Sequence, residues 1–320
     1  MSISGAKGSC MTETSEKSVL TGLIALILGA MAIGMAAPLV KLSELGPQTV
    51  GFWRMALAIP FALLWMQFDR NPPAKADTPT GWKRWAYLGL PGLLFTGDLA
   101  FWHAGIKITS VANATFLANL QPVFVVLATW LIFKETLTRQ FLFAAGLAVA
   151  GAALLSAGNI TVAPERWPGD LLSVGTAVWY AAYILAIRQA RRFASTGTVI
   201  FFTTLVSAPL LALTALGFGE NILPGTLTDW LVLLGLAVGV QIVGQGGVAF
   251  GLGRVPASVA SIIILIQPVV ASIAGWLMFG EAFAALQYAG AALVLTGVWR
   301  VQRKSQTAAT RGLAKPPASG

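Results

Sequence analysis

The sequence QPVFVVLATWLIFKE at residues 121–135 returns in altered form as QPVVASIAGWLMFGE at residues 267–281. Eight of the fifteen positions are identical, among them the opening Gln-Pro, the Trp-Leu pair and the closing Glu. Self-similarity at a fixed spacing, here 146 residues, indicates an internal repeat. The chain is therefore predicted to consist of two homologous halves.

Both copies of this segment lie within long apolar runs. Of the 320 residues, 56% are hydrophobic and only 10% are charged, whereas soluble domains carry about 25% charged residues. The gaps between charged residues are long enough for helices of about 20 apolar residues, the length that crosses a bilayer. The runs do not alternate polar and apolar residues as barrel strands do. The sequence therefore predicts an all-α integral membrane protein.

The apolar runs predict ten transmembrane helices. Their expected ranges are 19–41, 47–68, 85–106, 110–133, 139–157, 169–188, 196–217, 229–252, 256–279 and 282–300. The repeat spacing covers five of these helices, an odd number, so the two halves are expected to enter the membrane from opposite sides. The predicted organisation is a cytoplasmic tail (1–18), a first five-helix repeat (19–157), a periplasmic linker (158–168), a second five-helix repeat (169–302) and a disordered cytoplasmic tail (303–320).

Lysine and arginine positions predict the orientation of the chain. Cytoplasmic loops of membrane proteins carry an excess of these residues. If the amino terminus is inside, most of the basic loop residues fall inside as well, and the outer segments hold only Lys41, Lys107 and Arg166. We therefore predict a multi-pass protein of a bacterial inner membrane with both termini in the cytoplasm. Because the basic residues lie between apolar runs, the net charge of +9 does not indicate nucleic-acid binding.

Two copies of Gln-Pro, an apolar stretch and Trp-Leu-x-Phe-x-Glu, each followed by a Gly/Ala-rich helix, resemble the EamA family of the drug/metabolite transporter superfamily. The resemblance covers residues 20–300. It implies a ten-helix basket around a central cavity, alternating access, and often the export of amino acids or related metabolites. The overall pattern is similar to that of the aromatic amino acid and methyl viologen exporters. Inverted repeats are typical of secondary transporters, so we predict one that exports a small metabolite, such as an amino acid or aromatic compound.

Other functions remain as alternatives at this point. The substrate could be another organic solute or cation, as in multidrug transporters. A membrane enzyme would need a nucleophile, metal ligands or facing carboxylates, and only Asp98 among the acidic residues lies deep in a predicted helix. A scaffold or sensor would need a domain that passes on a signal. We expect a monomer whose partners are its small-molecule substrate and the lipid bilayer.

No cofactor or metal is expected from the sequence. The chain lacks the phosphate-binding pattern G-x-x-x-x-G-K-S/T, so it is not expected to hydrolyse ATP. It contains one cysteine, Cys10, and one histidine, His103. A zinc site normally takes three or four ligands from His, Cys and carboxylates. No catalytic residue is predicted either.

Pro122 and Pro268 are candidate hinges, because they occupy equivalent mid-membrane positions of the two halves. A proline removes one backbone donor and clashes with the carbonyl a turn earlier, and in lipid the freed carbonyl needs another partner. The bend could change between transport states or could be a static kink that shapes a cavity. Gln121 and Gln267, each directly before its proline, either satisfy the freed groups or face the substrate.

Arg54 and Asp98 are candidate gate and substrate residues. Both are predicted to lie roughly 10–12 Å below the outer surface on sequential helices, and charges at such depth normally face a cavity or a partner. They could form an outer gate or a static ion pair, and Asp98 could carry a proton. His103 titrates near neutral pH and follows Asp98 by about one turn, so it could contact substrate or simply lie at the interface.

Aromatic and amide side chains complete the candidate substrate site. The aromatic candidates are Trp102, Trp179, Tyr180 and Tyr183, and the amide candidates are Asn113, Asn119, Gln121, Gln241, Gln245 and Gln267. Aromatic rings suit a planar substrate or a cation bound over their faces, but they could equally face lipid or neighbouring helices. The amides could recognise polar parts of a ligand or join helices to one another.

The inverted repeat makes a prediction that labelling can check. In a variant without Cys10, a cysteine at Glu135 should react with a membrane-impermeant thiol reagent only from the cytoplasmic side. A cysteine at Glu281 should react only from the periplasmic side. Reaction of both positions from one side would contradict the inversion.

Overall fold

The computed structural model describes residues 4–69, 78–109, 114, 117–134, 137–157, 164–280 and 285–313, and every regular element within these residues is helical. The longer helices are α1 (Ser4–Gly34), α3 (Pro47–Phe68), α4 (Trp82–Ile108), α7 (Arg139–Ala157), α8 (Trp167–Ala190), α9 (Thr196–Gly217) and α14 (Ala285–Leu313). The shorter elements are α2 (Ala36–Lys41), α6 (Gln121–Phe133), η1 (Pro164–Arg166), α10 (Leu227–Gly235), η2 (Leu236–Gln245), α11 (Gly246–Leu252), α12 (Ala257–Ile264) and α13 (Ile266–Phe279).

These helices lie on the apolar runs of the sequence. Six stretches of the described chain are long and apolar enough to cross a membrane by length and composition: Glu16–Lys41, Pro47–Phe68, Trp167–Ala190, Thr196–Gly217, Leu227–Leu252 and Ala257–Phe279. The helices α4, α6, α7 and α14 fall on the other four predicted ranges. The chain is therefore a multi-pass helical membrane protein, as predicted. Residues 110–113, 115 and 116 of the fourth range lie outside the described residues.

Three of the long apolar runs are interrupted, and only the interruption beside Pro268 was indicated by the sequence. The first changes from α1 to α2 at Met35, and the ninth changes from α12 to α13 at Leu265. Each break lies three residues before a proline, Pro38 or Pro268, whose missing N–H and bulky ring disrupt the preceding turn. The eighth run contains the π-helix η2 between α10 and α11.

Helices extend further at both ends of the chain than the predicted spans. The helix α1 begins at Ser4 rather than at residue 19, and α14 continues to Leu313 rather than ending near residue 302. Residues 303–313, which we expected to be part of a disordered tail, are therefore helical as far as Leu313. The extensions contain Ala, Lys, Glu, Gln and Arg, which favour helix.

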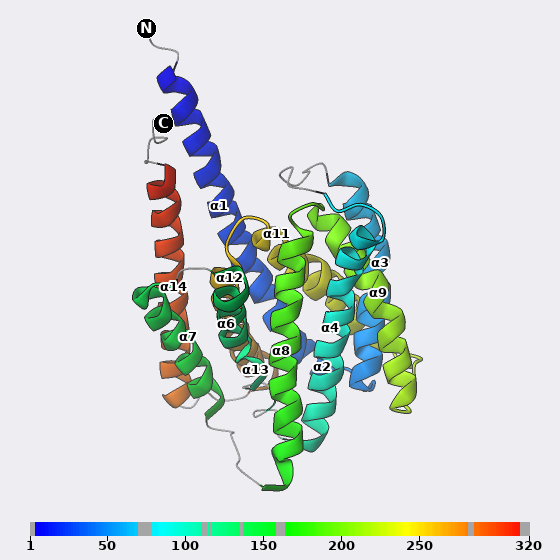
Figure 1. The fold of residues 1–320 in the computed structure, drawn as a ribbon. Helices are drawn as coiled ribbons and strands as arrows, with labels where there is room; N and C mark the ends of the chain where they lie inside the picture. The colour runs from blue at the N-terminus through cyan, green and yellow to red at the C-terminus, as the bar shows by residue number, and fades with distance from the viewer. Residues whose placement is uncertain are drawn as a thin grey trace.

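The described helices form one bundle in which sequence-distant segments pack together. The start of α1 and the end of α14 lie at the same end of the bundle, and α8 runs in the opposite direction to α1 (Figure 1). The most extensive packing joins α7 to α14, α4 to α8 and α3 to α9, while α1 packs against η2 and α11. Many apolar side chains at the bundle surface are exposed, among them Leu64, Leu131 and Leu213, as expected where lipid replaces water.

Small residues bring α1 and α11 into close contact. A Cβ atom added at Gly247 would lie 2.6 Å from the carbonyl oxygen of Ala25 and 3.1 Å from the Cα of Gly29. A Cβ added at Gly29 would lie 3.1 Å from the backbone nitrogen of Val248 in α11 and 2.7 Å from the carbonyl oxygen of Gly244 at the end of η2. Backbone atoms cannot move aside as a flexible side chain can. The two helices can therefore pack this closely only because these positions lack side chains.

This contact predicts a difference between two glycine substitutions in the same apolar span. Gly247→Ala should lower the free energy of unfolding by about 1–3 kcal/mol, because the new methyl group must push the helices apart. Gly239→Ala should cause no loss, because a Cβ there meets nothing within 4 Å. Thermal unfolding of the two variants in detergent would measure the difference. Equal melting temperatures would contradict the close packing of α1 on α11.

Candidate functional site

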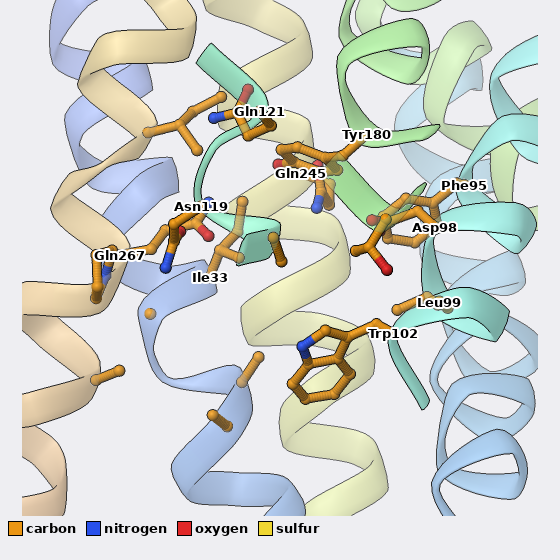
Figure 2. Close-up of a pocket in the computed structure, with 18 of the residues that line it drawn as sticks. Ile33, Phe95, Asp98, Leu99, Trp102, Asn119, Gln121, Tyr180, Gln245 and Gln267 are labelled. Carbon is orange, nitrogen blue, oxygen red and sulfur yellow. The ribbon is translucent and has the colours of Figure 1, made fainter. Parts of the chain in front are cut away.

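A cavity of about 190 Å³ lies between the helices and is lined by many of the polar and aromatic residues that were predicted as site candidates (Figure 2). Its walls come from the α1–α2 break, α3, α4, the start of α6, α8, η2, α12 and α13. The charged and amide residues that line it are Arg54, Asp98, Asn119, Gln121, Gln245 and Gln267, and the rings are those of Phe95, Trp102 and Tyr180. Asn119 and Gln267 lie across the cavity from Asp98 and Phe95 in this view.

The two charged residues of the cavity are both buried. Arg54 is 7% exposed and Asp98 is 8% exposed, and their opposite charges attract one another. The guanidinium of Arg54 donates from Nη2 to Oε1 of Gln241 at 3.0 Å and lies 5.5 Å from the centre of the Phe95 ring. Although both charges line the same cavity, no salt bridge joins them in the described part of the chain. Arg54 and Asp98 thus line one cavity, but the ion pair that was one expectation does not form.

Several buried polar atoms around the cavity have no hydrogen-bond partner among the described residues. They are Nε of Arg54, Oε1 of Gln121, the hydroxyl of Tyr180 and Nε2 of Gln267. The Tyr180 hydroxyl lies near Gln245 and Gln267 but forms no hydrogen bond of normal geometry with either. Buried polar groups without partners are uncommon and need an explanation. Their convergence on one cavity indicates a place where a polar ligand or water supplies the missing bonds.

Aromatic side chains form one wall of the cavity and a second layer behind it. Phe95, Asp98, Leu99 and Trp102 lie along one face of α4, which is the helical spacing expected for a shared face. Tyr183 lies behind this wall, fully buried, with its ring centre 4.7 Å from that of Phe95. The cavity therefore combines a flat apolar wall with polar groups.

The π-helix η2 supplies two glutamines, of which Gln245 lines the cavity and Gln241 lies behind it. Its Gln241 accepts the hydrogen bond of Arg54, and its Gln245 accepts one from the Tyr183 hydroxyl at 3.2 Å. Both glutamines are buried. Short π-helical segments within α-helices occur frequently at functional sites, and here the segment carries the amides that accept hydrogen bonds from Arg54, which lines the cavity, and from Tyr183 behind its wall.

Some predicted site residues do not line the cavity. Trp179 packs between α4 and α8, where it lies against Gly97 and its ring centre is 5.8 Å from that of Phe101. His103 is 3% exposed and lies near Gly51 of α3. Pro268 lines the cavity, whereas its counterpart Pro122 is buried but does not. Asn113 lies outside the described residues.

Other cavity residues were not singled out from the sequence. Phe95 and Leu99 could have been found from their spacing to Asp98, since residues three or four positions apart share a helical face. Ile33, Gly34 and Ala37 line the cavity because of the α1–α2 break, and their composition carries no such signal.

The two neighbouring tyrosines should respond differently to loss of their hydroxyl groups. Tyr183→Phe should lower the free energy of unfolding by about 0.5–1.5 kcal/mol, because it breaks the bond to Gln245 and leaves that amide unsatisfied. Tyr180→Phe should not destabilise the protein, because its hydroxyl has no partner to lose. Thermal unfolding of both variants in one detergent tests this. A greater loss of stability for Tyr180→Phe would mean that the Tyr180 hydroxyl forms a stabilising hydrogen bond.

Comparisons with known proteins agree with this architecture. The family model described as "EamA-like transporter family" matches residues 20–157 and 167–301. An uncharacterized transporter of Archaeoglobus fulgidus is 26% identical over 282 residues, which cover 87% of this chain and 96% of the relative. The pseudopaline exporter CntI of Pseudomonas aeruginosa is also 26% identical, over 67% of this chain and 76% of its own length.

Two further similarities cover different parts of the chain. The aromatic amino acid exporter YddG of Ancylobacter novellus is 31% identical over 162 residues, which cover 49% of this chain and 54% of that protein. A solved crystal structure superposes with a TM-score of 0.75 at 21% identity, over 91% of this chain and 98% of that one. At this level of identity the structural similarity shows the fold alone.

Proposed function

We propose that this chain, which belongs to the EamA-like transporter family, exports a small metabolite across a bacterial inner membrane by alternating access. As a member of this family the chain is a transporter and not an enzyme. Relatives named as exporters act on pseudopaline and on aromatic amino acids. The substrate that we propose here is an amino acid or a related aromatic compound.

The cavity is the observation that carries this proposal. Its volume of about 190 Å³ is below the range of roughly 300–1,000 Å³ that is usual for drug-sized ligands, which favours a small metabolite. Its aromatic wall favours a substrate with a planar or apolar part, and its unpartnered polar atoms favour a substrate with a polar end. An amino acid with an aromatic or apolar side chain combines both properties.

We also propose that residues 19–157 and 169–302 are two inverted five-helix repeats around this cavity. The most extensive packing contacts support this arrangement, because the repeat relates them to one another. The counterparts of α4 and α8 are η2–α11 and α1, respectively, and both pairs are in contact. The other two contacts join counterparts directly, α3 with α9 and α7 with α14. The opposite directions of α1 and α8 support it as well (Figure 1).

The end of α8 beyond the cavity is closely packed. On α8, Thr176 and Tyr180 line the cavity, whereas Ile184, Ile187 and Ala190 further along are fully or almost fully packed. The packed end of α8 lies at the end of the bundle where α1 begins (Figure 1). With both termini in the cytoplasm, as we propose, this packed end of α8 lies on the cytoplasmic side.

Arg191 closes the packed end of the bundle. It is buried just after α8, donates from Nε to the carbonyl oxygen of Ala249 at 3.1 Å, and also donates to the carbonyl oxygen of Ala194. Burial lowers the pKa of its guanidinium to about 10, so the side chain remains charged at neutral pH. It thereby joins α8 to α11 on the side that must open for an inward-facing state. Bending near Pro122 and Pro268 is our proposal for how the helices move.

An organic cation is the second candidate substrate. Asp98 and the surrounding rings favour it, since cations bind over aromatic faces. Arg54, however, lines the same cavity and repels a ligand that carries only positive charge. The zwitterionic amino acid is therefore the substrate we put first.

Flux through proteoliposomes tests the proposal. The purified protein should move at least one aromatic or apolar amino acid without ATP. Trp102→Ala should reduce that flux by about tenfold, because it removes an aromatic contact worth roughly 0.5–1.5 kcal/mol together with buried area. Trp82→Ala is the matched control and should leave flux unchanged, since Trp82 is 74% exposed at the start of α4.

Two results would contradict this proposal in different ways. Absence of flux for every amino acid and organic cation tried would argue against transport of such solutes altogether. Flux that both tryptophan variants retain equally would leave transport standing but would remove the cavity as the substrate site.

A further inference from the structure

We propose that Arg54 and Asp98 are the two poles of a binding site for a dipolar ion, a ligand that carries an ammonium group and a carboxylate on neighbouring atoms. Asp98 receives the ammonium and Arg54 receives the carboxylate. This inference rests on the proposed transport function and assigns the recognition of the two charges of its zwitterionic substrate to these two residues.

The first support is the arrangement of the two charges. Arg54 comes from α3 and Asp98 from α4; both are more than nine-tenths buried and both line the cavity. They attract each other, yet no salt bridge or hydrogen bond joins these two described side chains. A static structural pair would be in direct contact, because buried charges are stable only when they are paired. Here both charges line the cavity and do not contact each other.

The second support is that Arg54 and Asp98 both have hydrogen-bonding groups that no described residue satisfies. Gln241 holds one side of the Arg54 guanidinium through Nη2, while Nε of Arg54 has no partner. No described residue donates a hydrogen bond to the carboxylate of Asp98. Arg54 therefore keeps a donor for a carboxylate, and Asp98 keeps acceptors for an ammonium. Gln241, which faces Arg54 from η2, is a positioning residue for the guanidinium.

Neutral amides could complete the recognition of both ligand groups. Oε1 of Gln121 is a buried acceptor without a partner, and Nε2 of Gln267 is a buried donor without a partner. An ammonium needs acceptors and a carboxylate needs donors, so these two atoms match the two ends of a dipolar ion. Gln121 already donates from Nε2 to the carbonyl oxygen of Ser261 at 3.3 Å, which fixes the direction of its Oε1.

The charge pair also excludes the wrong ligands. A pure cation beside Asp98 would be repelled by Arg54, and a pure anion beside Arg54 would be repelled by Asp98. A zwitterion gives each buried charge its opposite and leaves neither without a partner. Discrimination by unfavourable contacts of this kind is a general source of specificity.

A matched ligand series tests the inference directly. L-Tryptophan, tryptamine and indole-3-propionate share one ring but carry both charges, only the ammonium, or only the carboxylate. Binding to the purified protein by calorimetry should be at least tenfold tighter for L-tryptophan than for either analogue. Leucine, 3-methylbutylamine and 4-methylpentanoate form a second series with the same three charge patterns. This series is used if the site is too narrow to admit an indole ring.

Single neutral variants should then change the preference in opposite directions. Arg54→Gln should weaken zwitterion binding and raise the relative affinity for the amine, because it removes the repulsion of cations. Asp98→Asn should raise the relative affinity for the carboxylic acid. The double variant R54Q/D98N leaves no unpaired buried charge, so it should fold and should no longer discriminate among the three ligands. Thermal unfolding and gel-filtration profiles check the fold of each variant.

Several outcomes would overturn the inference. They are equal affinity of the unmodified protein for the three members of a series, no binding of either amino acid, or a double variant that keeps the zwitterion preference. If proteoliposomes still show solute flux in these cases, the proposed transport function stands and only the dipolar site fails. If no solute moves at all, both fail together.

Discussion

A buried polar group inside a membrane has no bulk water to bind, so its partner must come from the protein or from a ligand. Most of this bundle meets that constraint internally. Hydroxyl groups within apolar spans bond carbonyl oxygens of the preceding turn, as Thr203 does with Val199 at 2.7 Å, or of a neighbouring helix, as Ser207 does with Gly92 at 2.8 Å. Against this background, the unpartnered atoms of Arg54, Gln121, Tyr180 and Gln267 are informative because they gather at one cavity.

The same constraint explains why the cavity lies beside interruptions of helices. A break in a membrane helix exposes backbone groups, and such breaks are tolerated where they line a cavity or are covered by protein. The α1–α2 break contributes Gly34 and Ala36 to the walls, and the α12–α13 break contributes Ile264 and Pro268. Elsewhere helices approach closely through glycine, as α1 and α11 do. The bundle thus combines close packing of α1 on α11 with a cavity where the backbone is irregular.

Much of this architecture could be predicted from the sequence. The lengths of the apolar runs predicted where the membrane helices lie. The polar residues inside those runs predicted Asp98, Gln245 and Gln267 as site candidates, and all three line the cavity. The helix face that lines the cavity was harder to predict. Trp179 and Tyr180 are adjacent on α8, yet only Tyr180 lines the cavity, because Trp179 fills the space over Gly97. Helices that are apolar all round give no amphipathic pattern to choose between these faces. The π-helix likewise depends on packing that composition does not encode.

The two Gln-Pro copies that define the repeat have different surroundings in this structure. Gln121 donates to the carbonyl oxygen of Ser261, whereas Nε2 of Gln267 has no partner, and Pro268 lines the cavity while Pro122 does not. Identical residues in two homologous halves thus differ in their bonds. The alternating access that we propose requires such an inequality, since the two halves then adopt different conformations in each state. A symmetric arrangement would close both sides of the cavity equally and leave it no side from which to receive a substrate.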